Sequence, residues 1–146
     1  MDLREGFQID EPNAFVPWSI TQAGLRALFG SHLREVTRGY FIVPCTSLGG
    51  LRHTLGFHFE PRQSDHLLEL EFFRSAAVPM AESYDDFQRH FERAFGPPTR
   101  SRPGTEGFAF HEWMLPAARI IHFVRDRFGP EEHMRIQTLA VPASRA

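Results

Sequence analysis

The sequence contains no lysine, a single asparagine (Asn13), a single cysteine (Cys45) and no long apolar run. One cysteine excludes an internal disulfide and a zinc site built from several cysteines. No segment approaches the roughly 20 apolar residues that a membrane-spanning helix needs. The acidic, polar start of the chain is not typical of a signal peptide. We therefore expect a cytoplasmic protein that does not act in a membrane.

The basic residues, 16 in number, are all arginine. Arginine suits surfaces that make bidentate contacts with carboxylates or phosphates. A GC-rich bacterial genome, whose codons favour arginine over lysine, is the simpler explanation. The formal net charge is −2, whereas nucleic-acid binders usually concentrate positive charge. The composition therefore predicts neither a nucleic-acid partner nor a membrane-surface partner.

A chain of 146 residues predicts one domain, 1–146, and its 15 phenylalanines supply much of the core. Six strand-like runs occupy residues 40–47, 51–60, 67–74, 107–115, 118–127 and 133–141. In the second and third runs apolar and polar residues alternate, which is typical of strands with one buried face. Gly49-Gly50 between the first two runs predicts a hairpin. Residues 1–17 are expected to form a short edge strand or an ordered arm.

Two helices are expected. The first begins at Ser19, where Ser19 and Gln22 form a capping box, and it ends at Gly30. The second begins at Ser83 and ends at Gly96. It carries an aromatic stripe that we assign to the core, namely Tyr84, Phe87, Phe91 and Phe95.

The predicted element order, α-β-β-β-α-β-β-β, suggests an internal repeat, and Phe29-Gly30 recurs as Phe95-Gly96 at the second helix end. We predict an α+β fold, an antiparallel sheet of about six strands with two helices packed on one face, with a tandem αβββ repeat as a hypothesis. One detail conflicts with the repeat. Alternation would bury Ile121 and Phe123, whereas the repeat places His122 in the core. A central strand covered on both faces would remove the conflict.

The residues give little sign of catalysis, and no serine-hydrolase, dinucleotide or phosphate-loop motif is present. We expect no catalytic residues, no metal and no cofactor, and we assign Cys45 to the core. The eight histidines lack the close spacing of zinc motifs. A site assembled across strands, from His58 with Glu69 or Glu71, stays open.

The polar segment 125–133 contains Asp126, Glu131 and Glu132, which could act as acids, bases or ligands. We favour a structural assignment, in which Pro130 opens a short helical turn and both glutamates lie near its N-terminus.

The solvent side of the predicted sheet is the remaining candidate site. If both helices cover one face, the other face presents arginine, histidine and glutamate, a mixed-charge surface suited to protein docking. A merely solvated face is the alternative. The expected partner-binding residues are Arg52, His58, Glu69, Glu71, Arg119, Arg125, Glu131 and Glu132.

The runs VPWSITQAGLRALFG, LGGLRHTLGFHF and RFGPEEHMRI together resemble small bacterial α+β proteins found beside polymorphic or secretion-system toxins, many of them immunity proteins. The resemblance implies a single-domain protein that binds and blocks a cognate toxin and has no catalysis of its own. Two alternatives stay open. One is a small enzyme or ligand-binding protein with a pocket between sheet and helices, and the other is a secretion chaperone. The pocket would use His58, Glu69, Glu71 or His122.

Overall fold

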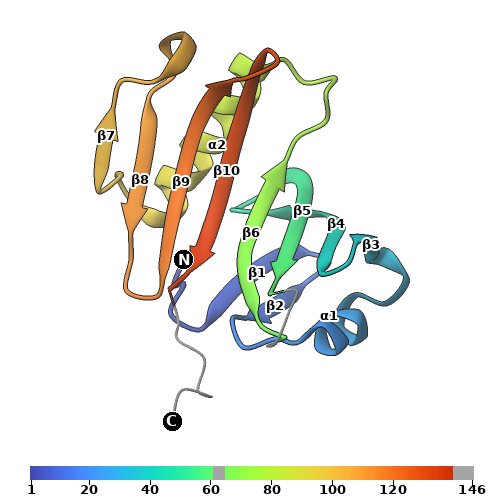
Figure 1. Ribbon diagram of the computed structural model, residues 1–146. Helices are drawn as coiled ribbons and strands as arrows, with labels where there is room; N and C mark the ends of the chain where they lie inside the picture. Colours follow the sequence, from blue (N-terminus) through green and yellow to red (C-terminus); the bar gives the residue numbers. More distant parts are fainter. Residues whose placement is uncertain (61–64, 140–146) are drawn as a thin grey trace.

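The computed structural model describes residues 1–60 and 65–139, and within them the chain forms two α-helices and one antiparallel sheet of ten strands (Figure 1). The helices are α1 (Gln22–Phe29) and α2 (Met80–Phe95). The strands are β1 (Gly6–Glu11), β2 (Ala14–Pro17), β3 (Arg34–Thr37), β4 (Tyr40–Ser47), β5 (Leu51–Phe59), β6 (Leu67–Phe73), β7 (Arg100–Arg102), β8 (Phe110–Met114), β9 (Ala118–Asp126) and β10 (Pro130–Thr138). The α+β class is thus confirmed. The prediction of about six strands is wrong.

The sheet order, β2-β1-β4-β5-β6-β10-β9-β8-β7 with β3 beside β4, places the two halves of the chain side by side. After the β1–β2 hairpin, one helix followed by four strands occurs twice along the chain. The halves meet where β6 pairs with β10, and there Leu70 lies opposite Ile136. This order supports the repeat hypothesis, with one more short strand in each half than expected.

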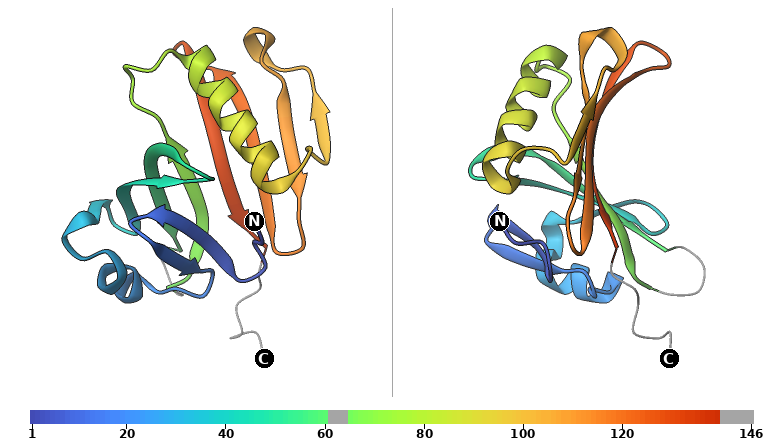
Figure 2. Two further views of the ribbon diagram at one scale, coloured as in Figure 1. Left: turned by 180° about the vertical axis from the view of Figure 1, so that it is seen from behind. Right: turned by 90° about the vertical axis from the view of Figure 1, so that its left-hand side faces the viewer.

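Both helices pack against the same face of the sheet. The ring of Phe29 on α1 lies 5.8 Å from that of Phe57 on β5, and the ring of Phe87 on α2 lies 5.9 Å from that of Phe72 on β6. Phe57 and Phe72 share a face, because Phe72 is paired with Leu55, two residues from Phe57. Figure 2 shows α2 and the β1–β2 hairpin on this side of the sheet. The opposite side, toward the viewer in Figure 1, is the open face.

Both helices end at the expected glycines, Gly30 and Gly96, whose φ angles of 57° and 84° suit residues without a side chain. The predicted first residues of the two helices are wrong. Thr21, two residues after Ser19, caps α1, since its side chain accepts a hydrogen bond from the backbone of Gly24 at 3.0 Å. The second helix begins at Met80, so Ser83 is an interior residue and is 2% exposed.

Strand β9 resolves the conflict in the repeat. His122 and Val124 are buried on the side of the helices, as the repeat requires, while Ile121, on the open face, is only 7% exposed. The strand is central in the sheet, and it buries residues on both faces although the open face has no helix packed on it in the described residues. The helical turn at Pro130 is not formed, because β10 begins at that residue and pairs with β9 from Asp126 onward.

No helix within 1–60 and 65–139 is long and apolar enough to cross a membrane. The cytoplasmic location stays a prediction.

Candidate functional site

The open face carries a chain of polar contacts that we call the charge network. Residues paired across neighbouring strands point to the same side of a sheet, so the register brings side chains of β4 to β10 into rows. The network consists of Tyr40, His58, Glu69, Glu71, Arg100, Glu112, Arg119, Arg135 and Gln137.

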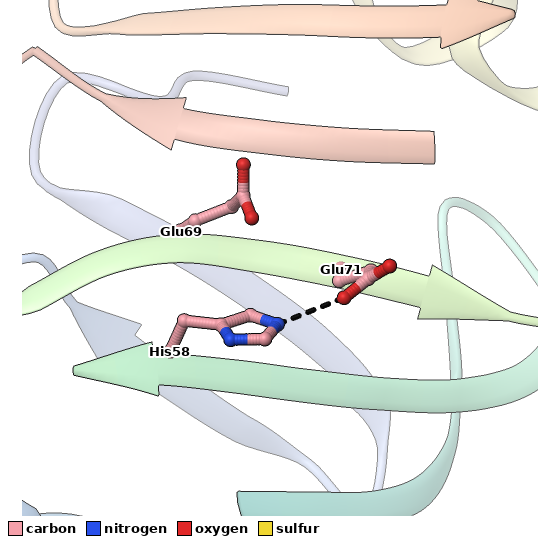
Figure 3. A group of neighbouring side chains, drawn as sticks. All are labelled: His58, Glu69 and Glu71. Atoms are coloured by element: carbon pink, nitrogen blue, oxygen red, sulfur yellow. Dashed lines mark hydrogen bonds and ion pairs between the residues drawn. The ribbon is translucent and has the colours of Figure 1, made fainter. Parts of the chain in front are cut away.

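A histidine and two glutamates form the first part of the charge network, on β5 and β6 (Figure 3). His58 Nε2 lies 2.8 Å from Glu71 Oε1, and a ligand atom from each of His58, Glu69 and Glu71 lies within 4.8 Å of the others. The His58 side chain is 33% exposed and that of Glu71 is 16% exposed. This part of the open face is therefore partly withdrawn from water.

Tyr40 fixes the orientation of His58. The two rings are stacked, with centroids 4.3 Å apart and planes 12° from parallel. Tyr40 can lie over the strands because Gly56 has no side chain, and a Cβ there would be 2.9 Å from the Tyr40 ring and 3.0 Å from Phe73. The glycine thus allows the aromatic contact that holds the imidazole. Burial raises the pKa of Tyr40, and the nearby Glu71 carboxylate adds to this shift.

Arg135 and Gln137 on β10 extend the charge network across the boundary between the halves. The guanidinium of Arg135 lies 3.7 Å from Glu69 Oε2 and 3.7 Å from Glu71 Oε2, while the Gln137 amide donates to Glu69 Oε1 at 3.1 Å. Burial acts to raise the pKa of Glu71, but the hydrogen bond from His58 and the charge of Arg135 outweigh it. The net pKa of Glu71 is therefore lowered, and the carboxylate stays charged.

The charge network continues to the far edge of the sheet through Arg119, Glu112 and Arg100. Arg119 donates to Gln137 Oε1 at 2.9 Å and also to Glu112, and Arg100 donates to the other oxygen of Glu112 at 2.7 Å. The hydrogen bond from Arg119, followed by that from Arg100, lowers the pKa of Glu112 in spite of burial. Every carboxylate of the network therefore has a cationic neighbour.

Beside the charge network runs a stack of flat side chains. Phe123 lies between Phe110, at 5.1 Å and 26°, and His133, at 4.9 Å and 11°. The guanidinium of Arg102 lies 4.0 Å from the centre of the Phe110 ring. The open face thus combines ordered charge with aromatic and arginine side chains, which are enriched in protein interfaces.

Four arginines surround this centre and are exposed, namely Arg34, Arg52, Arg102 and Arg125. We call them the rim arginines. Each is paired across strands with a residue of the open face, and none makes an ion pair within the described part of the chain. Glu131, opposite Arg125 and with a side chain 46% exposed, is the acidic residue among them.

The structure brings together most of the predicted partner-binding residues. Arg52, His58, Glu69, Glu71, Arg119, Arg125 and Glu131 all lie on the open face. The placement of Glu132 on that surface is wrong. It is paired with Val124 and faces α2, so its carboxylate is buried and lies 2.7 Å from His122 Nε2. Gln88 of α2 contacts the other ring nitrogen at 2.8 Å, and Tyr84 stacks on the imidazole at 4.2 Å.

Sequence reasoning missed the partners that organise the open face. Tyr40, Arg135 and Gln137 were not assigned to the open face. Tyr40 is the first residue of the predicted strand 40–47, and Arg135 and Gln137 lie at alternate positions of the predicted strand 133–141. A consistent count of period two along β10 would have found Arg135 and Gln137, because they alternate with buried Met134 and Ile136. Arg100 and Glu112 depend on the pairing of β7 with β8, for which the sequence has no signal.

Two pockets among the described residues lie away from the charge network. One, of about 410 Å³, is at the edge of β4 and is lined by Glu11, His32, Cys45 and Arg52 among others. Burial raises the pKa of the Cys45 thiol to about 12, which favours the protonated thiol and fits a core residue. The space between α2 and the sheet is filled by Phe87, Phe91 and Trp113, each at most 1% exposed. The arrangement thus favours a surface over a pocket.

Comparisons with known proteins show little similarity. No protein-family model and no curated protein matches the chain. A crystal structure of a DUF4309 family protein (YjgB) from Bacillus subtilis subsp. subtilis str. 168 is similar to it, with 12% sequence identity and a TM-score of 0.44, over 81% of this chain and 78% of that protein.

Proposed function

We propose that this chain is a protein-binding module whose open face docks onto an acidic surface of a partner protein, and that it acts as an immunity-type inhibitor of a toxin. The observation that carries the proposal is the set of rim arginines, exposed and without ion pairs in the described residues, around an ordered centre. The class of partner, a toxin, comes from the resemblance of the sequence to immunity proteins.

The charge balance of the open face argues for an acidic partner. In the charge network, Arg100, Arg119 and Arg135 balance Glu69, Glu71 and Glu112. The rim adds four arginines and one exposed glutamate, although the whole chain has a net charge of −2. A positive rim on a slightly negative protein orients an approaching acidic surface toward this face and raises the association rate.

A protein suits this face better than a nucleic acid. Phosphates that follow a groove need continuous positive charge, and here Glu69 and Glu71 would lie beneath the backbone. Carboxylates at the centre can instead accept hydrogen bonds from the side chains or backbone of a protein. The stack of Phe110, Phe123 and His133 offers the aromatic contact on which tight interfaces depend.

The test is co-expression with the candidate toxin encoded next to this chain in its genome. We expect cells that express the toxin to survive when this chain is present, and we expect the two purified proteins to bind in calorimetry. Reversing two rim charges, Arg52→Glu with Arg125→Glu, is expected to weaken binding by about tenfold or more and to abolish rescue. The matched control is Arg93→Glu, an exposed arginine on α2 and thus on the other side of the sheet.

The outcomes separate the parts of the proposal. Survival that does not depend on this chain, with every adjacent candidate tested, would reject the immunity role. Binding that is weakened equally by the rim double variant and by Arg93→Glu would reject the open face as the docking surface.

A further inference from the structure

We propose that His58, Glu69 and Glu71 form a binding site for a divalent transition-metal ion such as Zn²⁺ on the open face (Figure 3). The site is independent of the proposed docking function and would exist in the isolated protein.

The donor atoms are suited in kind and in position to such an ion. One imidazole nitrogen and two carboxylate oxygens come from adjacent strands, and the three atoms lie within 4.8 Å of one another. Ligands around Zn²⁺ lie at about 2.0–2.2 Å from the ion. His58 Nε2 and Glu71 Oε1 are 2.8 Å apart, close enough for one ion to contact both at such distances.

The surroundings hold the ligands in place before any ion binds. Tyr40 stacks on the His58 ring, and Gly56 makes room for that contact. The Gln137 amide donates to Glu69 Oε1 at 3.1 Å and so orients the second carboxylate. Outer contacts of this kind fix the direction of metal ligands and typically change affinity by about 10- to 100-fold. They distinguish this group from a loose cluster of surface acids.

Arg135 serves as the counter-charge of the two carboxylates. Its guanidinium is 3.7 Å from each, longer than the roughly 2.7–2.9 Å of a strong charge-assisted hydrogen bond. The side chain is 31% exposed, so it can move outward when an ion takes its place between the glutamates. Arg135 and the ion therefore compete for the same negative charge, and this competition gives the proposal a specific test.

The donor set also selects the type of ion. An imidazole with two carboxylates suits Zn²⁺ and similar transition metals, whereas Mg²⁺ and Ca²⁺ prefer oxygen donors alone. We expect Zn²⁺ to bind and Mg²⁺ to bind at least tenfold more weakly.

The experiment is calorimetric titration of the full chain, freed of metal, with ZnCl₂ and MgCl₂ at neutral pH. We expect one Zn²⁺ per chain, with affinity reduced about tenfold or more in His58→Ala and in Glu71→Gln. Arg135→Gln, which removes the competing cation, is expected to tighten Zn²⁺ binding. In NMR spectra, the His58 imidazole signals should shift on titration with Zn²⁺, and circular dichroism should show that each variant is folded.

The control is His32→Ala, since His32 is exposed and lies on the short turn after α1, away from the network. Zn²⁺ affinity that falls as much in His32→Ala as in His58→Ala would overturn the site. Unchanged affinity in folded Glu71→Gln, or weaker binding in folded Arg135→Gln, would also overturn it. Loss of partner docking has no bearing on these measurements.

Discussion

Replacement of Glu132 by alanine is expected to destabilise the protein strongly, although the residue looks like a surface charge in the sequence. The Glu132 carboxylate is 7% exposed and lies 2.7 Å from His122 Nε2, and the His122 side chain is fully buried beneath α2. Burial lowers the pKa of His122, while its hydrogen bond to the Glu132 carboxylate acts in the opposite direction. The substitution would therefore leave a ring nitrogen in the core without a partner.

The size of the effect follows from two contributions. A hydrogen bond to a charged group stabilises by about 1.5–3 kcal/mol, and a buried polar atom left without a partner costs about 1–3 kcal/mol. We expect the free energy of unfolding to fall by about 3 kcal/mol, which lowers the melting temperature by roughly 10 °C in a domain of this size.

Urea denaturation followed by circular dichroism measures this loss, with Glu131→Ala as the matched control. Glu131 is the preceding residue on the same strand, its side chain is 46% exposed, and the His133 ring nitrogen is 3.6 Å from its carboxylate. Its replacement should change stability by no more than about 0.5 kcal/mol. Equal losses in the two variants would refute the assignment of Glu132 to the core. The double variant His122→Phe, Glu132→Leu should recover much of the loss, because an apolar pair needs no partner.

Three further predictions concern the strands around the site. Gly56→Ala should destabilise by about 1–3 kcal/mol, measured in urea, because the new Cβ meets the rings of Tyr40 and Phe73 at 2.9–3.0 Å; a stability equal to that of the parent would contradict this contact. Cys45, buried and with its pKa raised to about 12, should react with a thiol reagent roughly a hundredfold more slowly in the folded protein than in urea; equal rates would show that it is accessible. Burial lowers the pKa of His53 from 6.5 to about 4, so between these pH values the unfolded chain binds more protons than the folded one. The free energy of unfolding should therefore fall by up to about 3 kcal/mol as the pH is lowered from 6.5 to 4. In His53→Gln, the free energy of unfolding should depend less on pH in this range. An equal pH dependence in the two proteins would contradict the role of His53.

The sequence predicted the long strands well, because the apolar residues of each strand indicate which of its faces is buried. The runs 40–47, 51–60 and 67–74 match β4, β5 and β6 to within a residue. The four strands beyond the expected six have only three to six residues, too few for alternation to be recognised. Two of them, β1 and β2, lie within residues 1–17, for which a short edge strand or an ordered arm was expected. Short pairings such as β7 with β8 depend on the rest of the sheet being formed, and a local pattern cannot show that.

The first residues of the helices were also predicted poorly from local sequence. Ser19 and Ser83 satisfy the rule for a capping residue, yet Thr21 does the same at α1 and the chain enters α2 at Met80 without a side-chain cap. Capping contributes only about 1 kcal/mol, so packing of the aromatic stripe of α2 on the sheet can decide where the helix begins. The helix ends were predicted correctly, because at Gly30 and Gly96 the backbone has positive φ angles that favour glycine.

The candidate site was predictable on the strands whose faces were assigned correctly and not elsewhere. His58, Glu69 and Glu71 lie on strands of clear alternation. Glu132 was misplaced because a helical turn was expected at Pro130, and a strand through that point turns the residue toward α2. A side chain that changes face in this way exchanges a solvated position for a buried one.

The arrangement of charge explains how a protein of net charge −2 can present a positive rim on the face that we propose for docking. In the charge network, Arg100, Arg119 and Arg135 offset Glu69, Glu71 and Glu112. Apart from its histidine, the centre is therefore neutral, and its charged groups are already held in fixed positions. The rim arginines therefore dominate the field of this face. Exposed charges are screened over about 8–10 Å at physiological salt, so association should depend on salt, whereas the compensated centre should contribute to specificity after contact is made.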